Sequence, residues 1–184
     1  MKVEGVSSHE VLDAGSGYTV GVMASNMIHL ETASTVFNLR VVAVFTHGDY
    51  VLIHRAESDY SWSLPGGRAE FGESTREAVA REMQEELKVK VEVGRLLWVL
   101  EYFFEFQARA WHEVNFCYQT SFPPGANVTP DTPTFYGDDM GMPLIFRWVH
   151  LDELQGVRLY PSFLKTALRE LPETPRHVVL REEE

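Results

Sequence analysis

The 184-residue chain has little of three things on which whole classes of protein depend: cysteine, excess positive charge and long apolar segments. Its one cysteine, Cys117, excludes an internal disulfide framework and a cysteine-rich zinc site. With 16 Lys and Arg against 27 Asp and Glu, the formal charge is −11, which argues against binding to a nucleic-acid polymer. The apolar stretch from Tyr18 to Leu30 is too short and too polar to span a bilayer. We therefore expect a cytoplasmic protein that does not bind membranes.

The composition is that of a globular protein, with 45% hydrophobic and 23% charged residues. The length suggests one domain with extensions. Residues 1–35 are rich in Ser and Gly, and we predict an N-terminal extension that adds a strand or mediates homodimerisation. Residues 36–171 are predicted to form the main domain, and residues 172–184 a C-terminal tail whose last four residues are frayed.

Hydrophobic periodicity and turn residues predict an α/β (α+β) fold with a mixed sheet and helices on its faces. The predicted strands span residues 36–45, 50–54, 91–106, 111–122 and 144–150. Helices are predicted at residues 74–87, 151–154 and 162–171. Residues 123–143, which contain five prolines, are predicted to be a long irregular loop.

The most informative stretch is an acidic segment at the end of the first predicted helix. Glu82, Glu85 and Glu86 are three and four residues apart, so their carboxylates project from one flank of the helix. Such like charges repel one another, and the helix macrodipole disfavours anions near its C-terminal end. A hard divalent cation such as Mg²⁺ or Mn²⁺ would offset both effects. The alternative interpretation is a solvated helix face without a ligand.

Position by position, the segment from Gly67 to Val89 resembles the signature of the Nudix hydrolase family, the Nudix box, G-x5-E-x7-R-E-U-x-E-E-x-G-U with U aliphatic. Lys88 is the one departure, because the family has glycine there. We expect Lys88 to end the helix in a left-handed conformation, at a cost of about 1 kcal/mol. The resemblance covers residues 36–155 and implies a Nudix-type α/β/α sandwich with a mixed β-sheet.

The resemblance implies a metal-dependent pyrophosphohydrolase that cleaves the phosphoanhydride of a nucleoside diphosphate linked to a group X. The three carboxylates of the acidic segment would bind Mg²⁺ or Mn²⁺, and one of them is an alternative general base. The main-chain carbonyl of Gly66 would complete the metal shell. Glu73 and Arg81 are expected to form an ion pair that ties the preceding loop to the helix.

Residues outside the box are candidates for the remaining roles. An additional acid or base is expected from Asp138, Asp139 or Glu113, with a plain surface carboxylate as the alternative for each. Phosphate contacts are predicted for Arg55 and Arg68, which lie near the Gly-Gly loop, with solvated arginines as the alternative.

Aromatic residues are concentrated in the hairpin predicted between residues 91 and 122. Trp98, Tyr102 and Trp111 are predicted to contact the substrate, because amphipathic rings suit a half-open nucleotide cleft. Core packing is the alternative for all three.

The main rival to an enzyme is a catalytically silent Nudix-fold module that binds or senses nucleotides. Such modules are expected to lose box carboxylates, whereas this chain keeps all of them. The sequence therefore favours a hydrolase acting on a small nucleotide-type substrate, and it leaves the group X open.

Overall fold

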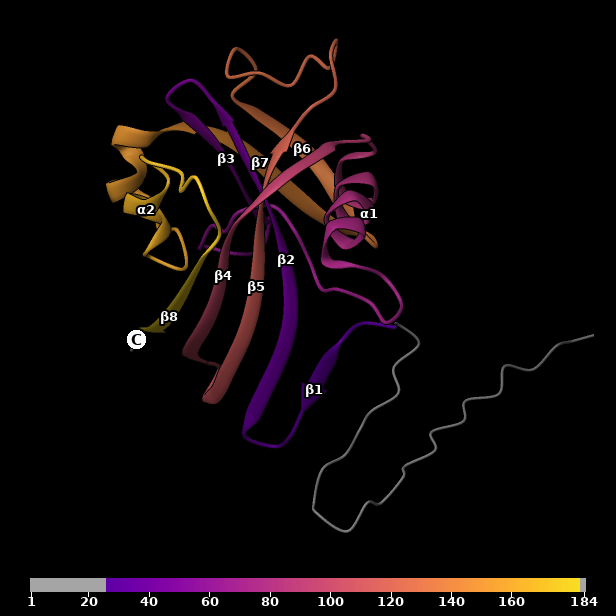
Figure 1. Ribbon diagram of the computed structural model, residues 1–184, viewed down its shortest axis with the longest axis vertical. Coiled ribbons are helices and arrows are strands. Elements are labelled where there is room, and N and C mark those ends of the chain that lie inside the picture. The colour runs from indigo at the N-terminus through magenta and orange to yellow at the C-terminus, as the bar shows by residue number, and fades with distance from the viewer. Residues whose placement is uncertain (1–25, 183–184) are drawn as a thin grey trace, which may run out of the picture.

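The computed structural model describes residues 26–182, which form an eight-stranded mixed sheet with helical segments on opposite sides (Figure 1). The strands are β1 (His29–Glu31), β2 (Thr35–His47), β3 (Tyr50–Ala56), β4 (Glu92–Phe106), β5 (Arg109–Ser121), β6 (Thr134–Asp139), β7 (Met142–His150) and β8 (Arg176–Glu182). The helices are α1 (Thr75–Leu87), the 3₁₀ helix η1 (Leu151–Gly156) and α2 (Leu164–Ala167). Most of the predicted N-terminal extension, with its dimerisation role, lies outside the described residues.

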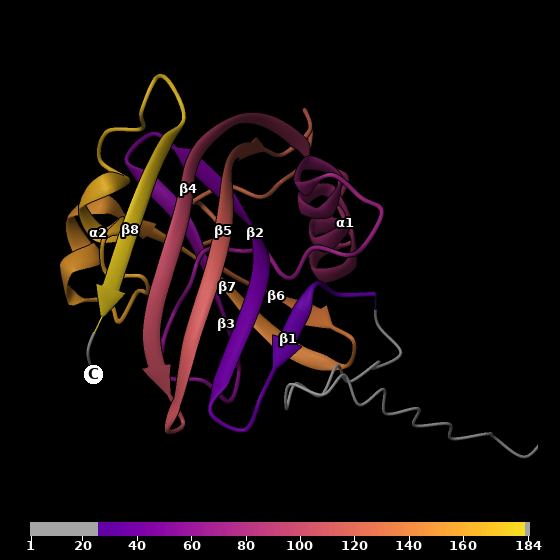
Figure 2. The same cartoon turned by 60° about the horizontal axis from the view of Figure 1, so that its bottom comes forward.

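The sheet divides into two parts that share β2. The strand order is β6-β7-β3-β2-β5-β4-β8. In addition, β1 pairs with β2 on the edge opposite β5. The β2–β3 pairing is confined to the hairpin end, where Thr46 faces Val51 and His47 faces Tyr50. Figure 2 shows the consequence: β8, β4, β5 and β2 lie side by side, with β3, β7 and β6 behind them. The pairs β2–β5 and β4–β8 are parallel, which makes the sheet mixed.

The two faces of β2 build two separate cores. Val42 and Val44 belong to a cluster that includes residues of η1 and α2. Val41, Ala43 and Phe45 point the other way and pack with residues of α1. The predicted α/β/α sandwich is therefore confirmed. Within residues 26–182, no helix has the length and apolar character needed to cross a membrane.

Helix α1 begins and ends as its sequence predicts. The Ser74 hydroxyl accepts a hydrogen bond from the Glu77 amide at 3.3 Å, and the Glu77 carboxylate accepts from the Ser74 amide at 2.8 Å, which completes a capping box. Lys88 ends the helix with φ 58° and ψ 26°, the expected left-handed conformation. The box helix thus has defined ends despite the missing glycine.

The structure corrects the prediction for residues 123–143. Residues 134–139 form the edge strand β6, which pairs with β7 across a tight turn in which Met140 and Gly141 both have positive φ. Within residues 26–182, β6 lies at an edge of the sheet, and it ends in the two charged residues Asp138 and Asp139, which suits an edge strand.

The C-terminal residues also differ from the prediction. Residues 176–182 form β8, which pairs in parallel with β4, and so Arg181 and Glu182 are part of the sheet and not a frayed end. The apolar, β-branched run from Val178 to Leu180 carried this signal. The helix predicted over residues 162–171 is only one turn long, because turns flank α2 on both sides.

Candidate active site

A cleft of about 1410 Å³ is lined by residues of the sheet and by the acidic residues of α1. Its lining brings together residues of β2, β4, β5, α1 and the β6–β7 turn. It contains most of the residues singled out in the sequence: Gly66, Arg55, Arg68, Arg81, Glu82, Glu85, Glu86, Tyr102, Trp111, Glu113, Asp138 and Asp139. Glu73 and Trp98 are outside this lining.

Two of the helix carboxylates are buried at the α1 side of the cleft. Glu82 is 5% exposed and Glu86 is 3% exposed. Glu86 Oε2 has no hydrogen-bond partner within residues 26–182 and lies 3.7 Å from Nδ1 of the buried His54. Burial raises the pKa of Glu82, and burial together with the charge of Glu82 raises the pKa of Glu86 to about 9. For Glu82, burial outweighs the charges of Arg81 and Arg40. For Glu86, burial and the charge of Glu82 outweigh the charge of Arg40.

Arg81 holds the loop before α1 against the helix. Its Nη2 lies 2.7 Å from Glu73 Oε1 and its Nε lies 3.0 Å from Glu73 Oε2, so the expected ion pair is present. Its Nη1 donates to Glu82 at 2.9 Å and to Glu85 at 3.0 Å. Although burial alone would raise the pKa of Glu73, the hydrogen bonds from Arg81 bring it below the ordinary value. Arg81 therefore orders three carboxylates at once.

Gly66 and Gly67 are required by close contacts at the edge of the cleft. A Cβ on Gly66 would lie 2.1 Å from the Val41 carbonyl oxygen, and the φ of Gly66 is +140°. A Cβ on Gly67 would lie 2.2 Å from Glu82 Oε2. Only glycine lets the loop approach β2 and the carboxylate of Glu82 so closely.

Arg40 is a site residue that the sequence reasoning missed. Its Nη2 donates to the Gly66 carbonyl oxygen at 2.9 Å, the same atom that the family resemblance assigns to the metal shell. Its charge acts to lower the pKa of both Glu82 and Glu86, although burial outweighs it. The signal was an arginine in the mostly apolar run from Val36 to Phe45.

The carboxylates of α1 and the Gly66 carbonyl are suitable donors for a hard divalent cation, but in this structure they do not form a complete binding site. Two buried carboxylates, one with an unpartnered oxygen, and a main-chain carbonyl are donors that Mg²⁺ and Mn²⁺ prefer. The described residues nevertheless contain no preformed group of three acidic, His or Cys side chains that could hold a metal. In this structure Glu85 is hydrogen-bonded to Arg81, and the Gly66 carbonyl accepts from Arg40.

The three additional acids differ in their surroundings. Asp138 accepts a hydrogen bond from the Gly141 amide at 2.8 Å and so stabilises the β6–β7 turn. Glu113 accepts from the Asn38 side-chain amide at 3.0 Å. Asp139 is close enough that its charge acts to raise the pKa of Glu86. Asp139 is therefore the best placed of the three beside the helix carboxylates.

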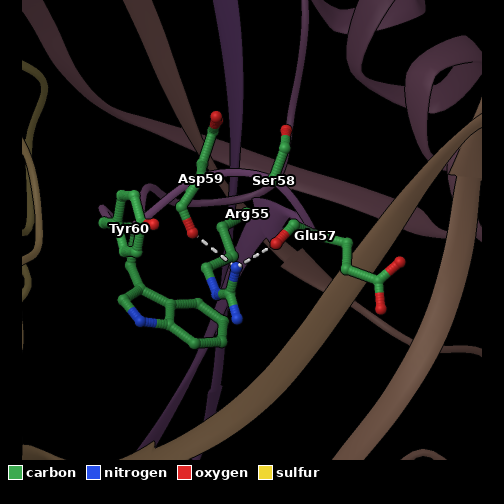
Figure 3. A pocket seen from close by; sticks show the side chains of 6 residues that line it. Arg55, Glu57, Ser58, Asp59 and Tyr60 are labelled. Atoms are coloured by element: carbon green, nitrogen blue, oxygen red, sulfur yellow. Dashed lines mark hydrogen bonds between the residues drawn. The ribbon is translucent and has the colours of Figure 1, made fainter.

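The two predicted phosphate-binding arginines are also unequal. Arg55 Nη1 donates to the carbonyl oxygens of Glu57 at 2.8 Å and Asp59 at 2.5 Å, in a small pocket of about 430 Å³ (Figure 3). Its guanidinium also lies over the ring of Trp62, 5.1 Å from the centroid. Arg68 is half-buried, and its Nε donates to the Asn38 side chain at 3.1 Å. Burial and the neighbouring Arg40 lower the pKa of Arg68.

The aromatic predictions require one correction. Trp98 is 2% exposed in the core and packs edge-on against Phe163, so it cannot contact a substrate. Tyr102 lines the cleft, and its hydroxyl donates to Glu182 at 2.5 Å. Trp111 also lines the cleft, with its ring stacked on Phe104 at a centroid distance of 5.7 Å.

The sandwich, the glycine loop and the acidic helix beside a large cleft define a Nudix-type domain. Residues 36–171 match the family model described as the NUDIX domain, and the chain belongs to this family, which places it in the class of Nudix hydrolases.

Individual proteins are similar to this chain in part of the sequence or in the fold. The chain is similar to a Bacillus subtilis (strain 168) protein named "Putative ADP-ribose pyrophosphatase YjhB", with 44% identity over 59 residues, 32% of this chain and 28% of that protein. Its fold resembles the MutT protein from Bacillus halodurans, with a TM-score of 0.55, 15% identity and coverage of 79% of this chain and 90% of the other. A NUDIX hydrolase from Nitrosomonas europaea gives a TM-score of 0.51, 15% identity and coverage of 83% and 82%.

Proposed function

We propose that the protein is a Mg²⁺- or Mn²⁺-dependent pyrophosphohydrolase, which cleaves the phosphoanhydride of a nucleoside diphosphate linked to a group X. The observation that carries the proposal is the buried Oε2 of Glu86, which has no hydrogen-bond partner in residues 26–182, beside the buried carboxylate of Glu82. Both lie at the side of a cleft large enough for a nucleotide. The curated relative named for ADP-ribose pyrophosphatase activity supports a substrate of this class.

Glu82, Glu85, Glu86 and the Gly66 carbonyl would hold the metal. A bound divalent cation would neutralise the pyrophosphate oxygens and make hydroxide available at neutral pH. Glu85 is the most exposed of the three glutamates, with 54% of its side chain accessible, and its role requires release from Arg81. Burial raises the pKa of Glu82 and of Glu86, and a bound cation would favour the ionised form of both carboxylates.

Arginine side chains supply positive charge for the substrate phosphates. Within residues 26–182, Arg40 and Arg68 line the cleft and neither forms an ion pair with a carboxylate. Guanidinium groups without carboxylate partners are suited to binding phosphate oxygens. Asp139 or one of the helix glutamates would accept the proton of the attacking water.

A substrate panel tests this proposal. Nucleoside di- and triphosphates, ADP-ribose and nucleotide sugars are incubated with the protein and Mg²⁺ or Mn²⁺, and phosphate is measured after phosphatase treatment of the products. We expect hydrolysis of at least one compound, its loss in EDTA and its recovery when the cation is returned. Binding of these compounds without cleavage in either metal would instead identify a sensor module.

A further inference from the structure

One polar side chain on the sheet floor of the cleft has a polar atom without a partner. Asn115, on β5, is 4% exposed, and its Nδ2 has no hydrogen-bond partner in the part of the chain that the structure describes. The residue lines the cleft. A buried amide without a partner opposes folding, and it is retained where a ligand completes its hydrogen bonds.

A second buried asparagine on the same face provides the contrast. Asn38, on β2, is 3% exposed, yet its side chain bonds to His29 at 2.7 Å, to Arg68 at 3.1 Å and to Glu113 at 3.0 Å. The fold is therefore able to satisfy a buried amide on this surface. It does so for Asn38 and leaves the Nδ2 of Asn115 without a partner.

The register of the strands locates Asn115 relative to the glycine loop. It lies directly beside Arg40 on β2 and beside Leu100 on β4. Neighbouring strands are about 4.8 Å apart, so Asn115 is one step from the arginine that contacts the Gly66 carbonyl. On its other side the floor becomes apolar. A substrate whose phosphates lie at Arg40 would place its next, uncharged group over Asn115.

We propose that Asn115 is a specificity-determining residue that hydrogen-bonds an uncharged oxygen of the substrate, a sugar hydroxyl or a base carbonyl, next to the phosphates. This inference rests on the proposed function, because it assumes that the phosphates of a nucleotide lie at the Arg40 end of the floor. An amide is suited to such a group because it donates and accepts hydrogen bonds without carrying charge.

Stability measurements test the role of Asn115 without any ligand. Asn115→Leu replaces the amide by an apolar group of similar size, and we expect it to raise the urea midpoint of the ligand-free protein. The matched control is Thr120→Val on the same strand, because Thr120 is also 4% exposed but its hydroxyl donates to the Tyr118 carbonyl at 3.0 Å. We expect Thr120→Val to lower the midpoint. A lower midpoint for Asn115→Leu would show a structural residue and overturn the proposal.

Kinetics on the same variants test the contact itself. For the best compound of the panel, Asn115→Leu should lower kcat/KM about tenfold or more, mainly through KM, while Thr120→Val leaves it unchanged. Comparing ribo- with 2′-deoxynucleotides and with nucleotide sugars separates a sugar from a base contact. Equal KM values for wild type and Asn115→Leu on every cleaved compound would overturn the proposal. If wild type cleaves nothing, the proposed function fails, and the ligand-free urea comparison still decides the role of Asn115.

Discussion

Two parts of the cleft treat their polar side chains differently. In the box segment, which spans Gly67 to Val89, Arg81 bonds to three carboxylates and a capping box fixes the start of the helix. On the sheet floor, among the residues that the structure describes, the Nδ2 of Asn115 has no hydrogen-bond partner, and Arg40 contacts a carbonyl and forms no ion pair with a carboxylate. Arg81 thus holds Glu73, Glu82 and Glu85 in the box, where Glu86 is the exception, whereas Asn115 and Arg40 on the floor have polar atoms available for a ligand.

The first prediction concerns Glu85, the exposed glutamate at the end of the box helix, and asks whether it takes part in catalysis. Glu85→Gln should lower kcat at least about a hundredfold with the fold intact, because loss of a key catalytic group costs that much and the side chain is largely exposed. Initial rates at saturating substrate, with circular dichroism of the same sample, check this. Exposed Glu170→Gln is the matched control, and retained activity in Glu85→Gln would reject its assigned role.

Arg81→Lys tests whether the box holds its own shape. A lysine cannot reproduce the fork that joins three carboxylates, so we expect a loss of about 3 kcal/mol in the free energy of unfolding. Urea denaturation measures it. Arg169→Lys alters the exposed pair between Arg169 and Asp152 and should change stability by less than about 1 kcal/mol. If Arg81→Lys and Arg169→Lys changed the free energy of unfolding equally, the Arg81 network would contribute no more than an exposed ion pair.

Gly67→Ala tests the close approach of loop and helix. The new methyl group would meet Glu82 at 2.2 Å, so the carboxylate must move, with a cost of about 1–3 kcal/mol and weaker Mn²⁺ binding. Calorimetric titration with Mn²⁺ and urea denaturation measure the two effects. Gly156→Ala, where the added Cβ has no atom within 4 Å, should change neither. An unchanged Mn²⁺ affinity in Gly67→Ala would show that Glu82 is not a metal ligand.

Ser74→Ala should destabilise the protein by about 1 kcal/mol, because it removes the side-chain cap of α1. The free energy of unfolding, measured in urea at neutral pH, gives the value. Ser162→Ala is the control, since no side-chain hydrogen bond of Ser162 is present within residues 26–182. If the free energy of unfolding fell by much less than about 1 kcal/mol, packing and not the cap would define the start of the helix.

The pH dependence of this cap is the smallest expected effect. Hydrogen bonds from Ser74 lower the pKa of Glu77 from its ordinary value of 4.5. Because the carboxyl pKa is lower in the folded than in the unfolded protein, ionised Glu77 stabilises the folded protein at pH values above the unfolded-state pKa. This contribution is lost as the pH falls through the folded-state pKa. The stability difference between wild type and Glu77→Gln should therefore decrease between pH 6 and roughly pH 3. A constant difference over this range would contradict the shift.

The sequence predicted the box because its contacts are local. Glu73 and Arg81 are eight residues apart, and the capping box spans three. The floor depends instead on pairings such as Asn38 with Glu113, 75 residues apart, whose parallel register no local pattern specifies. Trp98 and Tyr102 could not be told apart from the sequence for the same reason. Both are on β4, but only the position of Tyr102 along the strand brings its ring to the cleft.

The parallel pairing of β2 with β5 also affects when the cleft can be completed during synthesis. Helix α1 precedes β5 in the chain, so a nascent polypeptide leaving the ribosome has its acidic helix before the strand that carries Asn115 exists. Joining β2 to β5 closes a long loop, and such non-local contacts form slowly. The ligand-binding surface is therefore completed late in biosynthesis, when a compound that bridges its polar groups would also favour the finished fold.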